Sequence, residues 1–455
     1  MSDMLASLAS NTWLAMGVML AAFLTLYGLL HLYTRLTAAR PETTRKMFHT
    51  GSGVLTLAFP FLFREPWPVL ALTGASALFI AAIKFLPSLR ARAGGVANRV
   101  DRSTLGEIYF PLSVALLFWL TQGEDRLLFV IPILVLTFAD ATCALVGGRY
   151  GLTPYVGASK SLEGSVAFVV IAFFCTHVPL LLWSGVGRAE SLLIATTLAL
   201  LVMVLEGSAW RGLDNLFIPI GGYFLLRAYV DMDAAALAAR LLVTCGLVAL
   251  IIIARRKTTL GDDSLAAGAF LCYLAWALMG WPWLVGPFAI LLGYRWLSPP
   301  TEDNSRRMHG VAAILSVWAP AVLWLVLGRA LSDPSLLLPY TVVFAAQLAM
   351  FGTSRLAFQF PDRRLEAIFA QVVVTSAAIV LIPLVLATGQ DVATVARALS
   401  TLPAIAAGAA LFVRAQPDIR NAEATPRRWI TQGAAAAAAS LAAWGSAVAV
   451  TRLLD

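Results

Sequence analysis

Stretches of roughly 20 predominantly apolar residues recur along nearly the whole chain, and a helix of that length can cross the hydrocarbon core of a bilayer. The composition agrees with this interpretation, since 60% of the 455 residues are hydrophobic and only 13% are charged. A soluble chain of this length needs more charge to cover its surface. The sequence therefore predicts an all-α, polytopic integral membrane protein and excludes an ordinary soluble enzyme.

We expect about sixteen transmembrane helices in two halves, residues 1–256 and 257–455. In the first half the segments are 11–33, 47–64, 67–88, 106–121, 125–147, 163–186, 190–206, 217–231 and 235–254. In the second half they are 264–280, 283–297, 309–330, 338–358, 367–387, 394–413 and 430–451.

The basic residues predict the orientation of these segments, because short cytoplasmic connections are enriched in Lys and Arg. With the N-terminus outside, most of the 33 basic residues fall on cytoplasmic connections, and both termini are then expected outside. Topology thus explains the net charge of +8, and nucleic acid is not an expected partner. Arginine greatly outnumbers lysine, which is typical of a GC-rich bacterial genome, so we expect the inner membrane of a bacterium.

Asp140 lies inside the apolar segment 125–147, near its cytoplasmic end. An ionisable residue within a membrane span is costly and therefore indicates function. The structural alternative is a buried carboxylate paired with a nearby arginine.

A segment rich in small residues follows, with Gly147, Gly148 and Arg149, and then Lys160 and Glu163 at the start of the next span. Backbone N–H groups at a helix start bind anions, and the two basic side chains could add charge for phosphates. The carboxylate of Glu163 would repel a phosphate unless a divalent cation stood between them; alternatively, it only complements the helix dipole. Gly- and Ser-rich turns also commonly just end helices.

Three further segments reach the same cytoplasmic face: Arg45 to His49, Gly106 to Pro111, and Glu206 with the stretch from Asp214 to Pro219. Each also has a purely structural interpretation, as a basic collar or a helix cap. Carboxylates, basic residues and a Gly-rich helix start on one face are the parts that hold a metal–nucleotide and transfer a phosphoryl group.

Together these motifs, across roughly residues 40–225, resemble the polyprenol kinase family, which includes dolichol kinases and phytol kinases. They are Arg45-Lys46-x-x-His49, Gly106-Glu107-x-Tyr109-x-Pro111, Ala139-Asp140-Ala141 with Val146 to Gly151, Lys160-Ser161-x-Glu163-Gly164-Ser165, and Glu206 with Asp214-Asn215-Leu216-x-x-Pro219. The resemblance implies CTP-dependent, Mg²⁺-requiring phosphorylation of a long-chain isoprenoid alcohol such as phytol or a polyprenol.

The resemblance also implies a role for each matching residue. Catalytic roles fall to Asp140, Lys160, Glu163 and Glu206, and metal binding to Asp140, Asp214 and Glu206. Which carboxylate accepts the hydroxyl proton stays open at this point. Nucleotide binding falls to Arg45, Lys46, His49, Gly148, Arg149, Ser161, Gly164, Ser165 and Asn215.

Two alternative enzyme or transport functions remain, beside a purely structural membrane scaffold, which would leave Asp140 unexplained. The family is similar to phosphatidate cytidylyltransferases, but their Lys-Asp pair and His-Gly-Gly-x-x-Asp-Arg signature are missing from this sequence. A membrane transporter is the other, although the charged residues gather at one face instead of lining a path.

The second half more faintly resembles the membrane family of phytyl-phosphate kinases, through 261–268, 280–283 and 304–307. Where that family has acidic residues, this chain reads Ala349 to Ser354. We therefore expect no separate active site in residues 257–455.

Overall fold

The structure is a computed structural model that describes residues 10–37, 41–86, 105–155, 160–209, 212–255, 258, 260–297, 310–416, 418–420 and 425–454. Within these ranges, helices dominate and Pro154 and Ser161 form an isolated β-bridge. Among the described residues, eleven helices or runs of adjoining helices are long and apolar enough to cross a membrane, and Gly106–Leu120 and Trp281–Tyr294 are shorter apolar helices. The prediction of an all-α polytopic membrane protein is confirmed, while the count of sixteen spans stays a prediction.

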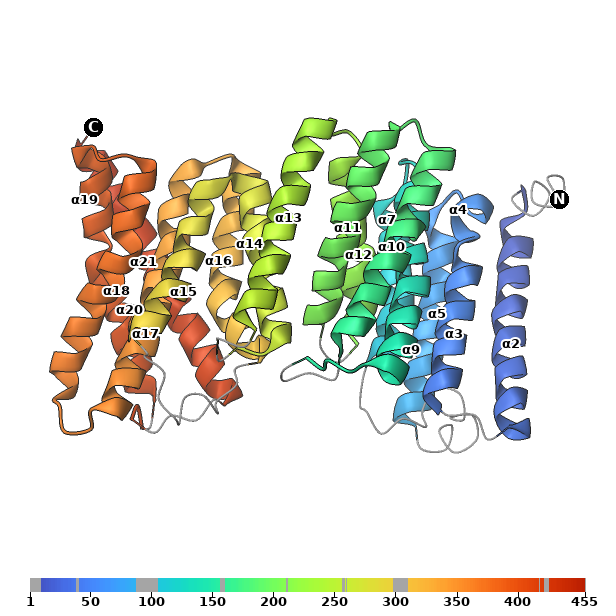
Figure 1. Ribbon diagram of the computed structural model, residues 1–455, viewed down its shortest axis with the longest axis horizontal. Helices are drawn as coiled ribbons and strands as arrows, with labels where there is room; N and C mark the ends of the chain where they lie inside the picture. Colours follow the sequence, from blue (N-terminus) through green and yellow to red (C-terminus); the bar gives the residue numbers. More distant parts are fainter. Residues whose placement is uncertain are drawn as a thin grey trace. The chain divides into compact units, whose positions relative to one another are not determined.

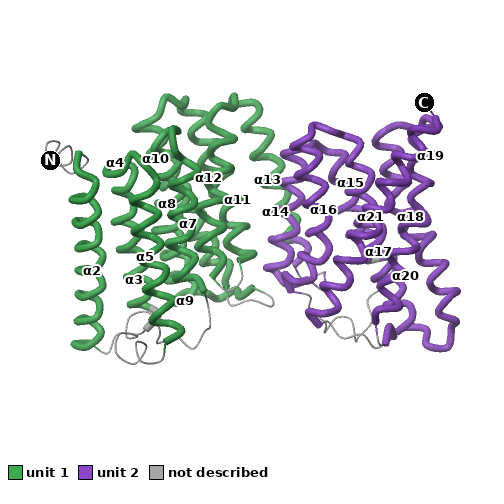
Figure 2. Tube along the Cα trace, turned by 180° about the vertical axis from the view of Figure 1, so that it is seen from behind, with its two compact units in different colours: residues 1–252 green, residues 253–455 purple. Residues whose placement is uncertain are grey.

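The chain forms two compact units, Met1–Ile252 and Ile253–Asp455 (Figure 2). The helices of the first unit run side by side, and their ends gather at two levels (Figure 1). They are α2 (Thr12–Leu36), α3 (Pro41–Thr56), α4 (Phe59–Leu62), α5 (Pro66–Phe85), α7 (Gly106–Leu120), α8 (Leu127–Leu134), η1 (Val135–Ala139), α9 (Asp140–Tyr150), α10 (Leu162–Trp183), α11 (Arg188–Ser208), α12 (Asp214–Tyr229) and α13 (Ala234–Ala254).

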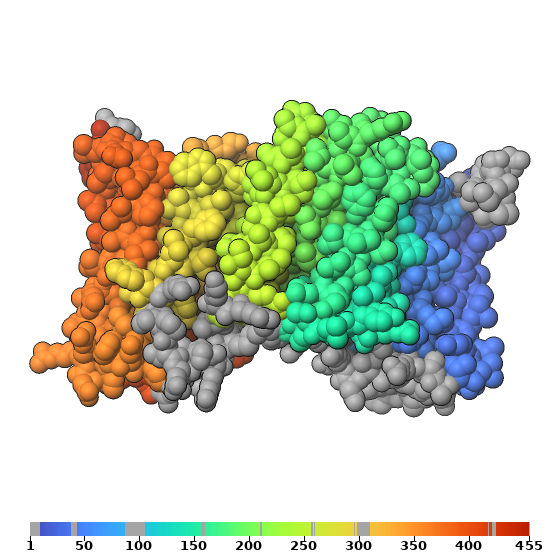
Figure 3. Space-filling model, viewed as in Figure 1, coloured from blue at the N-terminus to red at the C-terminus, as the bar shows by residue number. Residues whose placement is uncertain are grey.

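Burial separates the helices of this unit into a core and a periphery. In the most apolar 18-residue stretch of α11, 72% of the residues are buried, and in that of the continuous helix Leu127–Tyr150 the share is 67%. In α2 and α13 the shares are only 17% and 11%, and Figure 3 shows α13 exposing side chains along its length. Apolar side chains that face outward are what a lipid environment requires, whereas the helices with polar interior residues occupy the core.

A π-helical segment, η1, interrupts the helix Leu127–Tyr150 directly before Asp140. Pro132 lies within α8 one turn earlier and cannot donate a backbone hydrogen bond, which accounts for a local departure from α-helical pairing. Helix α3 approaches this segment closely at Gly53, because a Cβ there would lie 2.1 Å from Thr137 Oγ1. Gly53 therefore allows α3 to pack against the turn that carries Asp140.

The second unit is built around α17 (Leu337–Gln359), which is surrounded by other helices over most of its length. The others are α14 (Asp262–Met279), η2 (Trp281–Leu284), α15 (Val285–Leu297), α16 (Val311–Leu331), η3 (Pro334–Leu336), α18 (Leu365–Thr388), α19 (Val392–Ser400), α20 (Leu402–Ala415) and α21 (Pro426–Leu454). At its centre, Gln347 Nε2 donates to Ser316 O (2.8 Å), and Gln432 Nε2 donates to Gln347 Oε1 (2.6 Å). These amide contacts connect α16, α17 and α21.

Candidate active site

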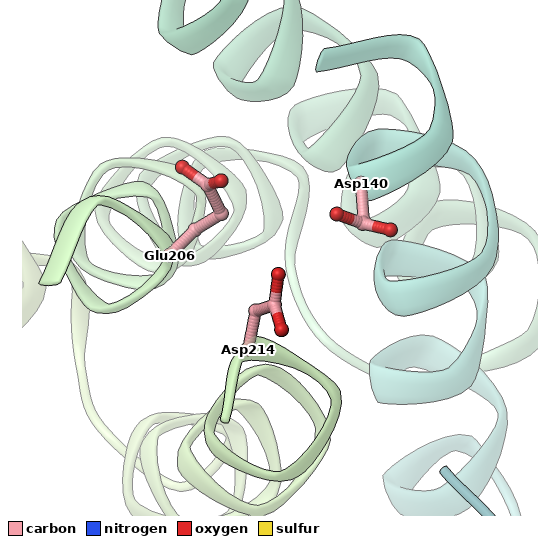
Figure 4. Close-up of side chains that lie close together, drawn as sticks. All are labelled: Asp140, Glu206 and Asp214. Carbon is pink, nitrogen blue, oxygen red and sulfur yellow. The ribbon is translucent and has the colours of Figure 1, made fainter. Parts of the chain in front are cut away.

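Three carboxylates from three helices meet in the first unit. Asp140 is the first residue of α9, Glu206 lies in the last turn of α11, and Asp214 is the first residue of α12. Their ligand atoms all lie within 4.8 Å of one another, and Figure 4 shows the side chains around a common space. Asp140 and Glu206 are buried and Asp214 is half-buried.

The connection between α11 and α12 positions Asp214. Gly212 has a φ of +90°, and a Cβ there would lie 2.5 Å from the backbone N of Gly106, so this turn accepts only glycine. Asn215 Nδ2 donates to Gly106 O (2.8 Å), which attaches the start of α12 to the start of α7. Asp214 therefore projects from a backbone that is held on both sides.

Each of the two buried carboxylates forms an ion pair with a lysine. Lys46 Nζ lies 2.6 Å from Asp140 Oδ2, and Lys160 Nζ lies 2.7 Å from Glu206 Oε1. Lys160 Nζ also donates to the backbone carbonyl of Glu206. Burial opposes the charge of Lys160, but the carboxylates of Glu206 and Asp214 outweigh it and raise the pKa of the Lys160 ammonium, so this lysine stays protonated at any physiological pH.

A short antiparallel pairing in front of α10 presents Lys160. Tyr155 N donates to Lys160 O (2.8 Å), and Leu162 N donates to Thr153 O (3.0 Å). The carboxylate of Glu163 accepts from Thr153 N at 3.0 and 3.2 Å. This arrangement attaches the backbone of Lys160 and Leu162 to the segment from Thr153 to Tyr155.

His49 lies beside Asp140 on the α3 side of the site. Its Nε2 is 3.7 Å from Asp140 Oδ2 and 3.4 Å from Leu136 O, and its ring packs edge-on against Phe110 at a centroid distance of 5.0 Å. One turn of α3 separates His49 from Lys46, so both side chains reach the same carboxylate.

The residues present fit a hard divalent cation. Carboxylate oxygens are the ligands that Mg²⁺ prefers, and three helices supply them here. In addition, Glu206 Oε2 is buried and has no hydrogen-bond partner among the described residues. A buried acceptor without a donor is costly, and a cation would satisfy it.

Comparison with known proteins identifies the family. No protein-family model matches the chain, and no solved structure matches it significantly. The phytol kinase of Synechocystis sp. is 32% identical over 221 residues, which covers 47% of this chain and 91% of that protein. The chain belongs to the polyprenol kinase family. The dolichol kinase of Saccharomyces cerevisiae is 29% identical over 192 residues, covering 39% of this chain and 35% of that protein. The chain is thus an integral membrane enzyme of the lipid-alcohol kinase class, a class that requires a phosphate donor.

Four further motif residues of this polyprenol kinase lie on α3, α9 and α10. The carboxylate of Glu163 accepts a hydrogen bond from Thr153 N. The side chain of Arg149 is exposed, and its guanidinium lies over the ring of Tyr150. The catalytic role that the resemblance implies for Glu163 stays a prediction. Arg45 is half-buried on α3, and a Cβ at Gly148 would meet nothing within 4 Å.

The remaining residues suggested for nucleotide binding have structural contacts. Ser161 Oγ caps α10 by accepting from Gly164 N (3.3 Å), and Ser165 Oγ hydrogen-bonds Tyr155 OH (2.7 Å). A Cβ at Gly164 would lie 2.9 Å from Cys143 O, so this glycine lets α10 approach α9. Like the amide of Asn215, these groups position the neighbouring backbone.

Sequence reasoning missed the lysine–carboxylate pairs of this kinase, because it placed both lysines on phosphates. The partners are 94 residues apart for Lys46 and Asp140, and 46 apart for Lys160 and Glu206. Spacing carries no signal at such separations. A usable signal was the scarcity of lysine itself, since two of the few lysines lie in the functional motifs.

Proposed function

We propose that this chain transfers the γ-phosphate of CTP to the hydroxyl of a long-chain isoprenoid alcohol, such as phytol or a polyprenol, in a reaction that requires Mg²⁺. The observation that carries the proposal is the meeting of Asp140, Glu206 and Asp214 beside Lys46 and Lys160 in a chain of this family. Phosphoryl transfer depends mainly on positioning and on charge stabilisation, and this group of residues supplies both.

The acidic and the basic residues of the site would have different roles. Asp140, Glu206 and Asp214 would hold the cation, which when bound neutralises phosphate oxygens and orients the donor. The ammonium groups of Lys46 and Lys160 would bind the phosphates as compact positive charges. Burial of Asp140 and Glu206 keeps bulk water away, which favours an alcohol over water as acceptor.

The proposed site faces the cytoplasm of a bacterial inner membrane, with both termini of the chain outside. Support comes from the basic connections, which the positive-inside rule places on the cytoplasmic side together with the starts of α3, α10 and α12. Nucleotides and Mg²⁺ are available there, and a lipid alcohol can arrive laterally from the bilayer.

The test incubates the purified protein in detergent with Mg²⁺, phosphatidate and a set of prenols: phytol, geranylgeraniol, farnesol and dolichol. The phosphate donor is γ-labelled CTP, or γ-labelled ATP in a parallel reaction. We expect label in a prenyl phosphate, and a loss of about 100-fold or more in Asp140→Asn and Lys160→Ala, because both remove charge at the reacting phosphate. Asp391→Asn is the matched control, since Asp391 caps α19 in the second unit and asparagine caps equally well. Chelation of the metal should stop the transfer, and added Mg²⁺ should restore it.

Other destinations of the label would contradict the proposal. Label in pyrophosphate with consumption of phosphatidate would indicate a cytidylyltransferase. No enzyme-dependent label with any nucleoside triphosphate would favour a transporter. Transfer from ATP but not CTP would overturn the choice of donor alone.

A further inference from the structure

The two lysines of the site are engaged with the carboxylates that would bind the metal. Lys46 takes Asp140 Oδ2 and Lys160 takes Glu206 Oε1, and in both pairs the carboxylate side chain is less than a tenth exposed. A metal ion and an ammonium group therefore compete for the same two carboxylates. Each lysine must leave its carboxylate before Asp140 and Glu206 can bind a cation through all of their oxygens.

The net charge of these carboxylates and lysines indicates how a bound cation would change the affinity of the site for phosphates. Three carboxylates, each −1, and two ammonium groups, each +1, leave a net charge of −1 around Asp140, Glu206 and Asp214. Glu206 Oε2 has no hydrogen-bond partner among the described residues, so one ligand atom is already available to a cation. A dication added to this group would change its net charge to +1, which would attract a polyphosphate.

We propose that Lys46 and Lys160 act as exchangeable counter-ions, so that the divalent cation binds weakly alone and the nucleotide strengthens its binding by accepting the two lysines on its phosphates. This inference rests on the proposed nucleotide-dependent function and adds how the site is loaded. It makes the metal and the nucleotide bind with positive coupling, and by linkage each ligand strengthens the other equally.

The side chain of lysine suits this exchange. Its ammonium is a compact charge on a flexible four-carbon stem, so it can leave a carboxylate oxygen for a nearby phosphate oxygen without movement of the backbone. Lys160 is the more accessible of the two, with 21% of its side chain exposed against 10% for Lys46. Lys160 is therefore the lysine that moves more easily.

The test measures Mn²⁺ binding by electron paramagnetic resonance on the purified full-length protein in detergent, with and without the β,γ-methylene analogue of CTP. For the unmodified protein we expect the analogue to tighten Mn²⁺ binding about 10- to 100-fold, the usual range for coupled sites. Lys46→Met and Lys160→Met should each bind Mn²⁺ alone about 10-fold more tightly, because the competing charge is gone, and the analogue should then tighten binding less.

Two further variants distinguish an effect of the lysine charge on Mn²⁺ binding from an effect on folding. Lys46→Arg keeps the positive charge and should bind Mn²⁺ alone as weakly as the unmodified protein. Lys84→Met removes a lysine of α5 that pairs with Glu107 (3.5 Å) outside the acidic group, and it should change neither affinity. Thermal unfolding of each variant shows whether it is folded.

Weaker or unchanged Mn²⁺ binding in both folded Lys→Met variants would overturn the proposal, as would an analogue that has no effect on the unmodified protein. The metal-only arm contains no nucleotide and no lipid, so it can fail while label transfer to a prenol succeeds. Conversely, a chain that transfers no label can still show metal binding that tightens when a lysine is removed. The two proposals therefore fail independently.

Discussion

Glu163 and Glu206 both lie beside the Lys160 segment, but their carboxylates contact different groups. Glu163 accepts from a backbone N–H, whereas Glu206 pairs with an ammonium and retains an unpartnered oxygen. We expect Glu163→Gln to keep activity within about twofold, because an amide oxygen can still accept from Thr153 N and only the favourable charge at the helix start is lost. Glu206→Gln should lose nearly all label transfer. Equal losses in the two variants would mean that Glu163 has a direct role in the reaction.

Asn215 is the residue through which Asp214 is tied to α7. In Asn215→Ala the carbonyl of Gly106 loses its buried donor, and the free energy of unfolding should fall by about 1 to 3 kcal/mol. Asp214 would then be held less firmly, so the Mg²⁺ concentration for half-maximal activity should rise. Titration of activity with Mg²⁺ checks this, and a fall in stability with an unchanged Mg²⁺ requirement would show that Asn215 does not position the acid.

At the scale of elements, the close contact between α3 and η1 requires a residue without a side chain at Gly53, and substitution tests this requirement. A methyl group at this position would lie 2.1 Å from Thr137 Oγ1, so Gly53→Ala must push η1 or α3 aside, at a cost of about 1 to 3 kcal/mol in the free energy of unfolding. The displaced turn carries Asp140, and Mn²⁺ binding should weaken as well.

The matched control is Gly148→Ala in α9. A Cβ there meets nothing within 4 Å, and alanine favours a helix interior over glycine by about 1 kcal/mol. Thermal unfolding should therefore shift in opposite directions in the two variants. Equal behaviour would contradict the close packing of α3 on η1.

The helices could be predicted from sequence because apolar periodicity is a local property of 20 or so residues. Asp140 could be recognised for a similar reason, since a carboxylate in an apolar run stands out at once, whereas Glu206 and Asp214 were identified through the family resemblance. The π-helical turn before Asp140 and the amide contact of Asn215 could not, because each depends on packing between segments far apart in the chain. The contact of Glu163 with Thr153 N could not be predicted for the same reason, because it belongs to a turn that sequence alone does not define.

At the scale of the whole molecule, each unit has a polar centre of a different kind. The first contains ionised groups, and the second contains the amides of Gln347 and Gln432. Amide pairs between membrane helices typically contribute about 0.6 to 2 kcal/mol to stability.

We therefore expect Gln347→Leu to destabilise the protein by about 1 to 2 kcal/mol, since it leaves the amide of Gln432 without its acceptor. The double variant Gln347→Leu/Gln432→Leu should recover most of this loss, and both should retain normal label transfer. Unfolding in a denaturing detergent, followed by the kinase assay, measures the two properties separately. Abolished transfer in the folded double variant would show that the second unit takes part in catalysis.

The lysine–carboxylate pairs also bear on how the chain enters the membrane. Lys46 precedes Asp140 by 94 residues and Lys160 precedes Glu206 by 46, so during synthesis each counter-ion leaves the ribosome before the acid it neutralises. An unpaired aspartate at the centre of a span costs about 2.5 to 3.5 kcal/mol at the translocon. In this chain, each buried acid meets a basic partner that has already been synthesised.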